Sequence, residues 1–214
     1  MELVNYLLNI YGYGNPIFIK DVRIGQKSKT AIREEFYRAC KKGELKRKGQ
    51  GVYSIVDKRP TDFLPEVVSF ERILFKKYLI EKNAPDGMEK LFVCGYYSGL
   101  AFVNAIGISQ QVPAIIEITT NRTSSKKSYY TIDRRIAIIR KGKTTITSQN
   151  YKMLQFLDMF HFITMNEVIW NKKLLKDYIK KHNLTKMQFS EYIKFYGTQT
   201  IKKIVEGGII DAFV

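Results

Sequence analysis

The sequence predicts an α+β protein, with an N-terminal winged helix-turn-helix followed by a mixed α/β domain that has a small sheet and C-terminal helices. Two observations predict this class: a capped amphipathic helix leading into a basic hairpin at residues 28–54, and apolar strand-like runs alternating with helices after residue 90. A polar stretch containing Pro60 lies between the two parts. We therefore expect a first domain at residues 1–60 and a second at 61–214.

The composition indicates a polyanionic partner. The chain has 214 residues and a formal charge of +16, from 36 Lys and Arg against 20 Asp and Glu. Such a balance suits nucleic acid or a membrane surface. No apolar run approaches the roughly 18 residues of a membrane-spanning helix, and the N-terminus lacks the basic start of a signal peptide.

Cysteine and histidine are too few to predict a metal site. Cys40 and Cys94 both lie in apolar surroundings, and the chain has only two histidines. We expect two reduced, buried thiols in a cytoplasmic protein, with no metal and no cofactor.

The first 27 residues predict two short helices and a turn. An amphipathic helix at residues 2–11 ends in glycine- and proline-rich turn sequence. A second, short helix is expected at residues 17–22, with Ile17, Phe18 and Val22 facing the core. Residues 23–27 then form the turn of the helix-turn-helix.

Residues 28–42 predict the recognition helix. Ser28 is a favourable N-cap, and Gly43 follows the last basic pair as a helix stop. An apolar stripe recurs at helical spacing and should face the core. The residues of this stripe are Ile32, Phe36, Ala39 and Cys40.

The opposite face of this helix predicts contact with DNA. A recognition helix enters the major groove with its N-terminal turns nearest the bases. Arg33 could bind a guanine edge through two hydrogen bonds, and hydroxyls suit phosphate or base contacts. The residues expected to bind DNA are Ser28, Lys29, Thr30, Arg33, Tyr37 and Lys41 on the helix, with Lys46, Arg47 and Lys48 in the wing. The alternative is a solvated basic face, as charge runs usually are.

The second domain predicts a small sheet and several helices. The expected elements are a helix at 69–82, a strand at 91–97, a small-residue helix capped by Ser98, strands at 114–120, 134–140 and 144–147, a helix at 150–163, and two or three helices between 170 and 206.

A second basic patch is predicted within residues 122–152. This segment has nine Lys and Arg and one acid, Asp133. If strands 134–140 and 144–147 pair, their outward residues form one surface for a phosphate backbone of DNA or RNA. The alternative is a merely soluble β-surface. The patch residues are Arg122, Lys126, Lys127, Arg134, Arg135, Arg140, Lys141 and Lys143.

Two segments resemble the AbiEi antitoxins of type IV (AbiE) toxin–antitoxin systems. Residues 96–121, YYSGLAFVNAIGISQQVPAIIEITTN, resemble the segment that follows the first strand of that family's C-terminal domain. The family has, in this order, a tyrosine–serine pair, a small-residue helix ending in an apolar–glycine pair, a proline, and a strand ending in threonines. Residues 42–55, KGELKRKGQGVYSI, also resemble the family's basic "GVY" hairpin.

The resemblance implies a bifunctional bacterial protein that serves in phage defence by abortive infection. The winged helix would bind inverted repeats of double-stranded operator DNA, cooperatively as more than one copy, and repress its own operon. The C-terminal domain would counteract a nucleotidyltransferase toxin, AbiEii, without a stable complex.

Three other functions are weighed against this one. A plain transcriptional regulator would have the same first domain and a sensing or oligomerising second domain. A metal-dependent nuclease would need clustered carboxylates and a lysine. Asp86 and Glu117 are its candidate acids, yet Thr119 stands where the lysine after Glu117 is needed. A membrane-surface role could use the basic helix at 172–182, whose apolar residues are more simply core. We expect a protein that is not an enzyme and has no membrane partner.

Overall fold

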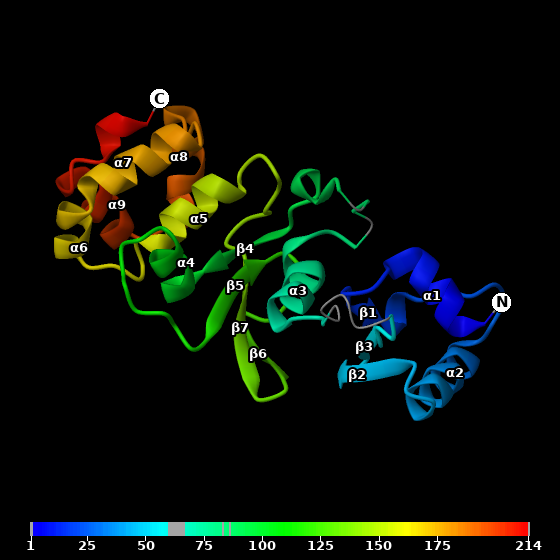
Figure 1. Ribbon diagram of the computed structural model, residues 1–214. Helices are drawn as coiled ribbons and strands as arrows, with labels where there is room; N and C mark the ends of the chain where they lie inside the picture. The colour runs from blue at the N-terminus through cyan, green and yellow to red at the C-terminus, as the bar shows by residue number, and fades with distance from the viewer. Residues whose placement is uncertain (1, 60–66, 83, 86, 214) are drawn as a thin grey trace. The chain divides into compact units, whose positions relative to one another are not determined.

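The computed structural model describes residues 2–59, 67–82, 84–85 and 87–213, and it has an α+β fold with two small sheets and several helices (Figure 1). The chain divides into two compact units. The first unit comprises Met1–Lys77 and Thr131–Arg135, and the second comprises Tyr78–Tyr130 and Ile136–Val214. The boundary predicted at residue 60 lies outside the described residues.

The described part of the first unit combines a three-stranded antiparallel sheet, in the order β1-β3-β2, with the helices α1 and α2 and, further along the chain, α3 (Phe70–Leu74). The elements before residue 60 are α1 (Leu3–Tyr11), β1 (Ile17–Phe18), the 3-10 turn η1 (Ile19–Asp21), α2 (Lys29–Lys41), β2 (Leu45–Gly49) and β3 (Val52–Ile55). The helix predicted at residues 17–22 was wrong. Ile17 and Phe18 instead pair with Tyr53 and Val52, and only a single 3-10 turn follows.

The helix α2 begins and ends as its sequence predicts. Ser28 Oγ accepts a hydrogen bond from the Ala31 N–H at 3.1 Å. At the other end, Gly43 has φ +67°, which glycine adopts without strain. The N–H groups of Gly43 and Glu44 donate to the carbonyls of Cys40 and Ala39, which are the two bonds of a Schellman motif.

The inward face of α2 closes the core of the first unit. Ile32, Phe36 and Ala39 are buried, and Cys40 is half-buried. The Phe36 ring meets the Tyr53 ring edge-on, with the centroids 4.9 Å apart. The predicted apolar stripe therefore fixes which face of α2 is left outward.

The predicted helix at residues 69–82 is interrupted. It forms α3 (Phe70–Leu74), with Ser69 as the N-cap, and continues as the π-helical turn η2 (Phe75–Leu79). Ile80 then makes an isolated antiparallel bridge with Val93.

The four-stranded sheet has the strand order β4-β5-β7-β6, and its residues outside Thr131–Arg135 belong to the second unit. Its strands are β4 (Gly95–Ser98), β5 (Ile116–Thr120), β6 (Lys127–Ile132) and β7 (Arg135–Lys141). β4 runs antiparallel to β5, and β5 runs parallel to β7. Three of these strands match predicted ones, but β6 was not predicted.

The strand predicted at residues 144–147 was wrong. The backbone N–H and carbonyl of Ile146 bond to the side-chain amide of Asn121, at 2.9 and 2.7 Å. The amide of Asn150 bonds in the same way to Thr145 O and Thr147 N–H. These two asparagines take the backbone groups that a strand partner would need.

The remaining elements of the second unit are mostly helical. They are η3 (Glu89–Leu91), α4 (Gly99–Ala105), α5 (Tyr151–Met159), α6 (Met165–Trp170), α7 (Lys172–Lys181), α8 (Lys186–Tyr192), η4 (Ile193–Phe195), α9 (Thr198–Glu206) and η5 (Ile210–Ala212). Ser98 precedes α4 but does not cap it through its side chain. The Ser98 hydroxyl lies 3.0 Å from the Thr119 hydroxyl instead.

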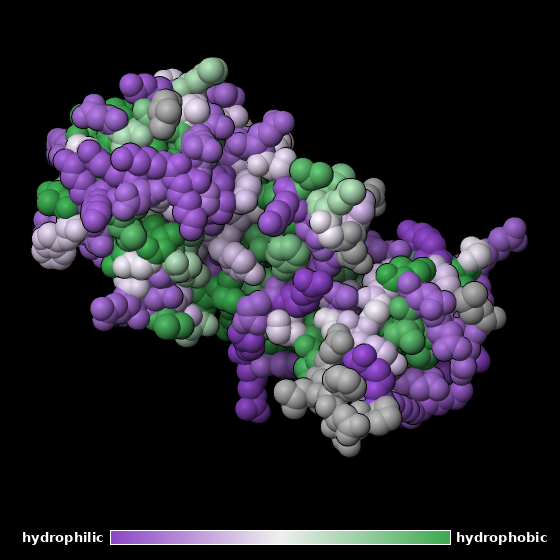
Figure 2. All heavy atoms as spheres, turned by 45° about the horizontal axis from the view of Figure 1, so that its top comes forward, coloured by the Kyte–Doolittle hydropathy of each residue, from purple (hydrophilic) through white to green (hydrophobic). Residues whose placement is uncertain are grey.

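The core of the second unit gathers around α5. Met153, Leu154, Phe156, Leu157 and Phe160 are almost wholly buried among residues of the later helices. Hydrophilic side chains cover much of the visible face of these helices (Figure 2). Across the described ranges, no helix joins the length and the apolarity needed to span a membrane.

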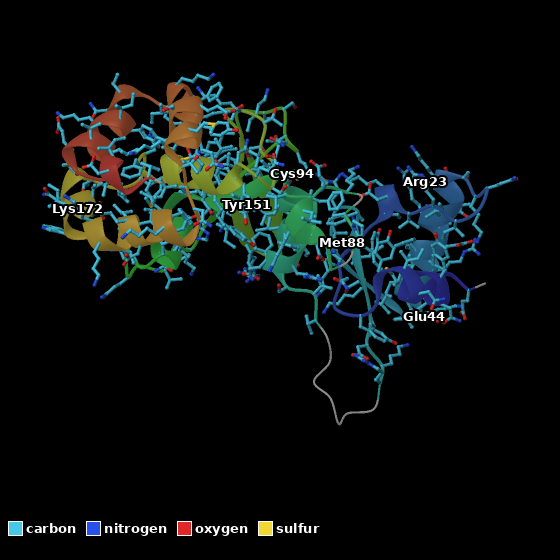
Figure 3. All side chains as sticks on the ribbon, turned by 90° about the horizontal axis from the view of Figure 1, so that it is seen from above. Arg23, Glu44, Met88, Cys94, Tyr151 and Lys172 are labelled. Atoms are coloured by element: carbon cyan, nitrogen blue, oxygen red, sulfur yellow. The ribbon has the colours of Figure 1, made fainter. Side chains whose placement is uncertain are left out.

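The two thiols differ in exposure. Cys94, labelled in Figure 3, belongs to the second unit and is completely buried, whereas Cys40 is half-buried. Burial raises the pKa of the Cys94 thiol to about 11, so this group stays protonated and unreactive at neutral pH.

Candidate functional site

The outward face of α2 carries the predicted DNA-binding residues in an exposed row. Ser28, Lys29, Thr30, Arg33 and Tyr37 are all exposed, and Tyr37 keeps 63% of its surface accessible. Spacing of three to four residues places Thr30, Arg33 and Tyr37 on one side of the helix. This row is polar, basic and aromatic, a composition suited to phosphates and base edges.

The cations of this row differ from their neighbours in pairing. Lys27 bonds to Glu35 at 2.5 Å, and Arg38 reaches Glu34 at 3.4 Å. Within the described residues, neither Lys29 nor Arg33 has an acidic partner at ion-pair distance. Their charges are therefore available to an external anion.

The rest of the predicted interface lies at the end of α2 and in the β2–β3 hairpin. The Lys41 ammonium lies 5.5 Å from the centre of the Tyr37 ring. Lys46 and Arg47 are exposed, and Lys48 is half-buried. Arg47 Nε donates to Gly49 O at 3.3 Å, which directs its side chain along the hairpin turn.

Lys20 joins this group, although the sequence did not single it out. It lines a small pocket of about 120 Å³ together with Lys29 and Arg33. Lys20 belongs to η1, within the segment 17–22 that the sequence predicted as a short helix with Ile17, Phe18 and Val22 facing the core. Lys20 lies near Lys29 and Arg33 only in three dimensions, which the spacing along the sequence does not show.

The residues predicted as the second basic patch are divided between the two units. Arg134 and Arg135 belong to the first unit, whereas the other six predicted residues belong to the second. Arg135 pairs with Glu71 and stacks on Phe70, 4.9 Å from the ring centre. The surface predicted from pairing 134–140 with 144–147 fails because the second of these strands does not exist.

Arg122 and Lys127 have local roles in the second unit. Arg122 donates to the Ile80 carbonyl at 2.9 Å. Lys127 lies over the ring of Tyr129, 5.3 Å from its centre. The four remaining patch residues are brought together elsewhere.

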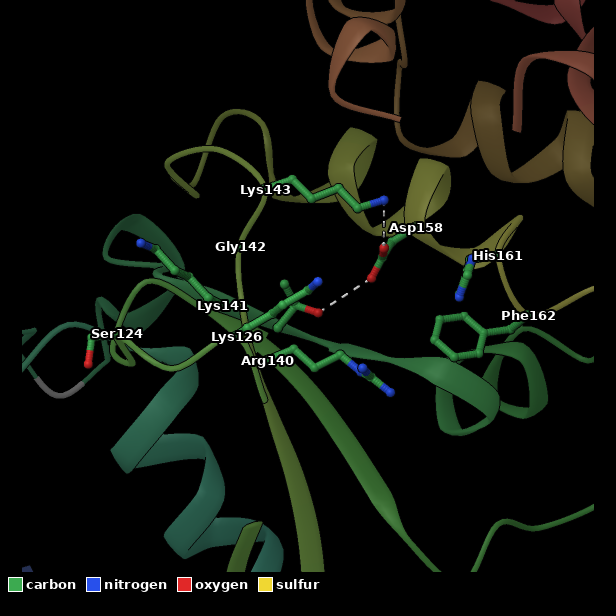
Figure 4. A pocket seen from close by; sticks show the side chains of 10 residues that line it. Ser124, Lys126, Arg140, Lys141, Gly142, Lys143, Asp158, His161 and Phe162 are labelled. Atoms are coloured by element: carbon green, nitrogen blue, oxygen red, sulfur yellow. Dashed lines mark hydrogen bonds and ion pairs between the residues drawn. The ribbon is translucent and has the colours of Figure 1, made fainter. Parts of the chain in front are cut away.

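A pocket of about 580 Å³ in the second unit collects these four cations (Figure 4). Strand β7 supplies Arg140 and Lys141, and the segment after it supplies Lys143. Figure 4 shows Arg140 and Lys143 directed toward one space, with Lys141 pointing away from them. The pocket is lined by Thr119, Ser124, Lys126, Arg140, Lys141, Gly142, Lys143, Asp158, His161 and Phe162.

Asp158 is the acid of this pocket. Its Oδ1 lies 3.6 Å from Lys143 Nζ, and its Oδ2 lies 3.4 Å from the Thr119 hydroxyl (Figure 4). Burial raises the pKa of Asp158, and the charge of the Lys143 ammonium opposes this shift without cancelling it. Asp158 therefore contacts both a cation and a hydroxyl of the pocket lining.

A second acid, Glu117, binds Arg140. Its Nε donates to Glu117 Oε2 at 2.9 Å. In the parallel register of β5 and β7, Arg140 lies beside Thr119, two residues from Glu117 on the same strand face. Glu117 is thus a sheet-face residue that orients an arginine, and Asp86 lies outside the described residues.

Several pocket residues were missed because they meet only in three dimensions. Thr119 lies on β5, and Asp158, His161 and Phe162 lie at the end of α5 and just after it. The spacing of Asp158 and His161 was a faint signal, since residues three apart share a helix face.

The chain matches no family model, no curated protein and no solved structure. Among the described residues, no three His, Cys, Asp or Glu side chains cluster as metal ligands would. The structural support for a function therefore comes from the two basic sites.

Proposed function

We propose that the first unit binds double-stranded DNA as a winged helix, with α2 as recognition helix and the β2–β3 hairpin as wing. The observation that carries the proposal is the exposed row Lys29, Thr30, Arg33 and Tyr37, combined with three consecutive basic residues in the hairpin. The order α1, β1, η1, α2, β2, β3 supports it, although η1 is only one turn long.

Each part of this interface has a distinct task. Arg33 offers the planar fork that binds a guanine edge through two hydrogen bonds, which contributes about 1–3 kcal/mol of base discrimination. Lys29 and the wing cations Lys46 and Arg47 bind phosphates, which gives affinity without sequence information. Ser28 holds the first turn of α2 in place through its cap.

We further propose that the chain is an antitoxin of a type IV toxin–antitoxin system and represses its own operon. Support comes from the resemblance of residues 42–55 and 96–121 to AbiEi antitoxins. The protein would act in the bacterial cytoplasm, bind operator inverted repeats cooperatively, and antagonise a nucleotidyltransferase toxin without forming a stable complex with it.

A gel shift with the DNA upstream of its gene tests the DNA-binding part. The double variant Lys29→Glu, Arg33→Glu should abolish the shift, because it replaces two phosphate- or base-binding cations with repelling charges. The control Lys180→Glu reverses an exposed charge on α7 and should leave the shift intact. Circular dichroism should show unchanged folding. Unaltered binding by the double variant would refute the recognition-helix assignment.

A rescue assay tests the antitoxin part. The neighbouring nucleotidyltransferase gene is expressed from an unrelated promoter, and the full-length double variant is supplied in trans. Because the promoter lacks the operator, repression cannot protect the cells. Survival is expected if the chain is an antitoxin, and continued killing by a toxic neighbour would refute it.

A second candidate is a transcriptional regulator whose second unit senses a small molecule. The specific observation in its favour is the basic pocket of the second unit, which has the size of a ligand site. Such a regulator would bind DNA through α2 in the same way but would give no rescue in the assay above.

A further inference from the structure

The pocket of the second unit has a cationic side. Lys126, Arg140 and Lys143 approach it from the strand β7 and its neighbours (Figure 4). Arg140 uses Nε to bind Glu117, and no other described side chain pairs with its two terminal nitrogens. These nitrogens point into the pocket and form the planar fork that matches a phosphate.

Lys143 is positioned from two directions. Its Nζ lies 3.6 Å from Asp158 Oδ1 and 3.8 Å from the centre of the Tyr196 ring. The Thr119 hydroxyl contacts the other carboxylate oxygen of Asp158. This arrangement restricts a flexible side chain before any ligand arrives, which lowers the entropy cost of binding an anion.

The opposite side of the pocket is aromatic. Phe162 and His161 line it, with ring centroids 5.2 Å apart and planes perpendicular. Both follow the C-terminal end of α5, where the helix dipole is negative. An anion is therefore disfavoured at this end, whereas a neutral planar ring can pack on the Phe162 face.

The size of the pocket restricts the ligand further. A volume of about 580 Å³ lies within the roughly 300–1,000 Å³ typical of small-molecule sites. The pocket is too small to admit a DNA duplex, because a duplex is wider than its own major groove, and that groove alone is about 12 Å wide. A ligand that fills it must carry its charge at one end and a flat ring at the other.

We propose that this pocket binds a nucleoside phosphate. Its phosphate lies against Lys126, Arg140 and Lys143, and its base packs against Phe162 beside His161. This function goes beyond DNA binding by α2 and does not depend on it, because all the residues involved belong to the second unit.

Isothermal titration calorimetry of the full chain with ATP and AMP tests the proposal. One site with a Kd below about 1 mM is expected for at least one nucleotide. Lys126→Gln and Arg140→Gln should each weaken binding by about tenfold, because each removes one phosphate-binding cation. Lys180→Gln, the matched control on α7, should change nothing. No detectable binding, or equal binding by all four proteins, overturns the proposal.

The aromatic side has its own test. Phe162→Leu keeps an apolar side chain against the core but removes the aromatic face, and it should weaken AMP binding about fivefold to tenfold. Tripolyphosphate, which has no base, should bind the wild-type protein more weakly than ATP does. Equal affinity for tripolyphosphate and ATP overturns the assignment of the base.

Two further experiments identify the source of the nucleotide and distinguish binding at this pocket from DNA binding by α2. Tighter binding of a 5′-phosphorylated trinucleotide than of ATP assigns the nucleotide to the end of a single strand, and the reverse assigns it to a free nucleotide. The Lys29→Glu, Arg33→Glu variant should retain nucleotide binding. If Lys126→Gln loses as much affinity for duplex DNA as it loses for ATP, the proposal is overturned.

Discussion

Asp158 shows how one buried acid can shape a basic site. Its carboxylate orients Lys143 and is itself contacted by Thr119. Burial nevertheless raises its pKa above the usual 3.8, because desolvation outweighs the attraction of Lys143. The folded protein therefore binds this proton more tightly than the unfolded chain does.

This shift predicts a pH dependence of stability. The contribution of Asp158 is most favourable below its unfolded pKa and falls as the pH rises through the raised folded value. Asp158→Asn keeps the shape and removes the titration. We expect the Tm of the variant, relative to wild type, to increase as the pH rises above about 4 and to level off once the pH has passed the raised folded pKa of Asp158.

Thermal melts across this pH range check the prediction. Lys143, His161, Tyr96 and Tyr196 face or influence the carboxyl group, and all four are present in both proteins. A Tm difference that does not vary with pH would contradict the assignment of the shift to Asp158.

The elements of the second unit pack closely where β4 passes the backbone of Tyr78. A Cβ built on Gly95 would lie 2.4 Å from Tyr78 O and 2.9 Å from Thr119 O. Thr120, fully buried on the neighbouring strand β5, donates to the same Tyr78 carbonyl at 2.5 Å. The absence of a side chain at Gly95 allows this approach.

Gly95→Ala should therefore destabilise the second unit by about 1–3 kcal/mol, since backbone must move to admit the methyl group. Gly197→Ala is a suitable control, because nothing lies within 4 Å of the added Cβ and its φ is −73°. Urea unfolding followed by circular dichroism measures both. Equal stability of the two variants would show that β4 can shift without cost.

At the scale of the whole molecule, the net charge of +16 is divided among sites with different tasks. The α2 and hairpin cations face outward, Arg135 is paired with Glu71 in the same unit, and Lys126, Arg140 and Lys143 surround a pocket. Net charge alone therefore overstates the number of residues that contact one nucleic acid.

This division predicts the salt dependence of DNA binding. Replacing Lys46 or Arg47 with Gln should reduce the slope of log Kobs against log salt concentration by about 1, because each phosphate contact releases about one counterion. Lys173→Gln on α7 should leave the slope unchanged. Filter binding at several salt concentrations measures this slope. An unchanged slope in the hairpin variants would show that the wing does not contact the phosphates.

The sequence predicted the local features of the chain. The cap at Ser28, the stop at Gly43 and the inward stripe of α2 are set by residues within one helical segment, so their spacing alone identifies them. Most other helices and the strands β4, β5 and β7 were predicted for the same reason, although their ends shifted by several residues.

Only the tertiary structure decided the features that depend on residues far apart in the sequence. β6 has a half-exposed pattern at the edge of its sheet and lacks a strong apolar alternation. The segment 144–147 had strand-like residues but lost its backbone groups to Asn121 and Asn150. The pocket joins residues from β5, β7 and the end of α5, and only folding brings them together, because long-range contacts are not encoded in local spacing.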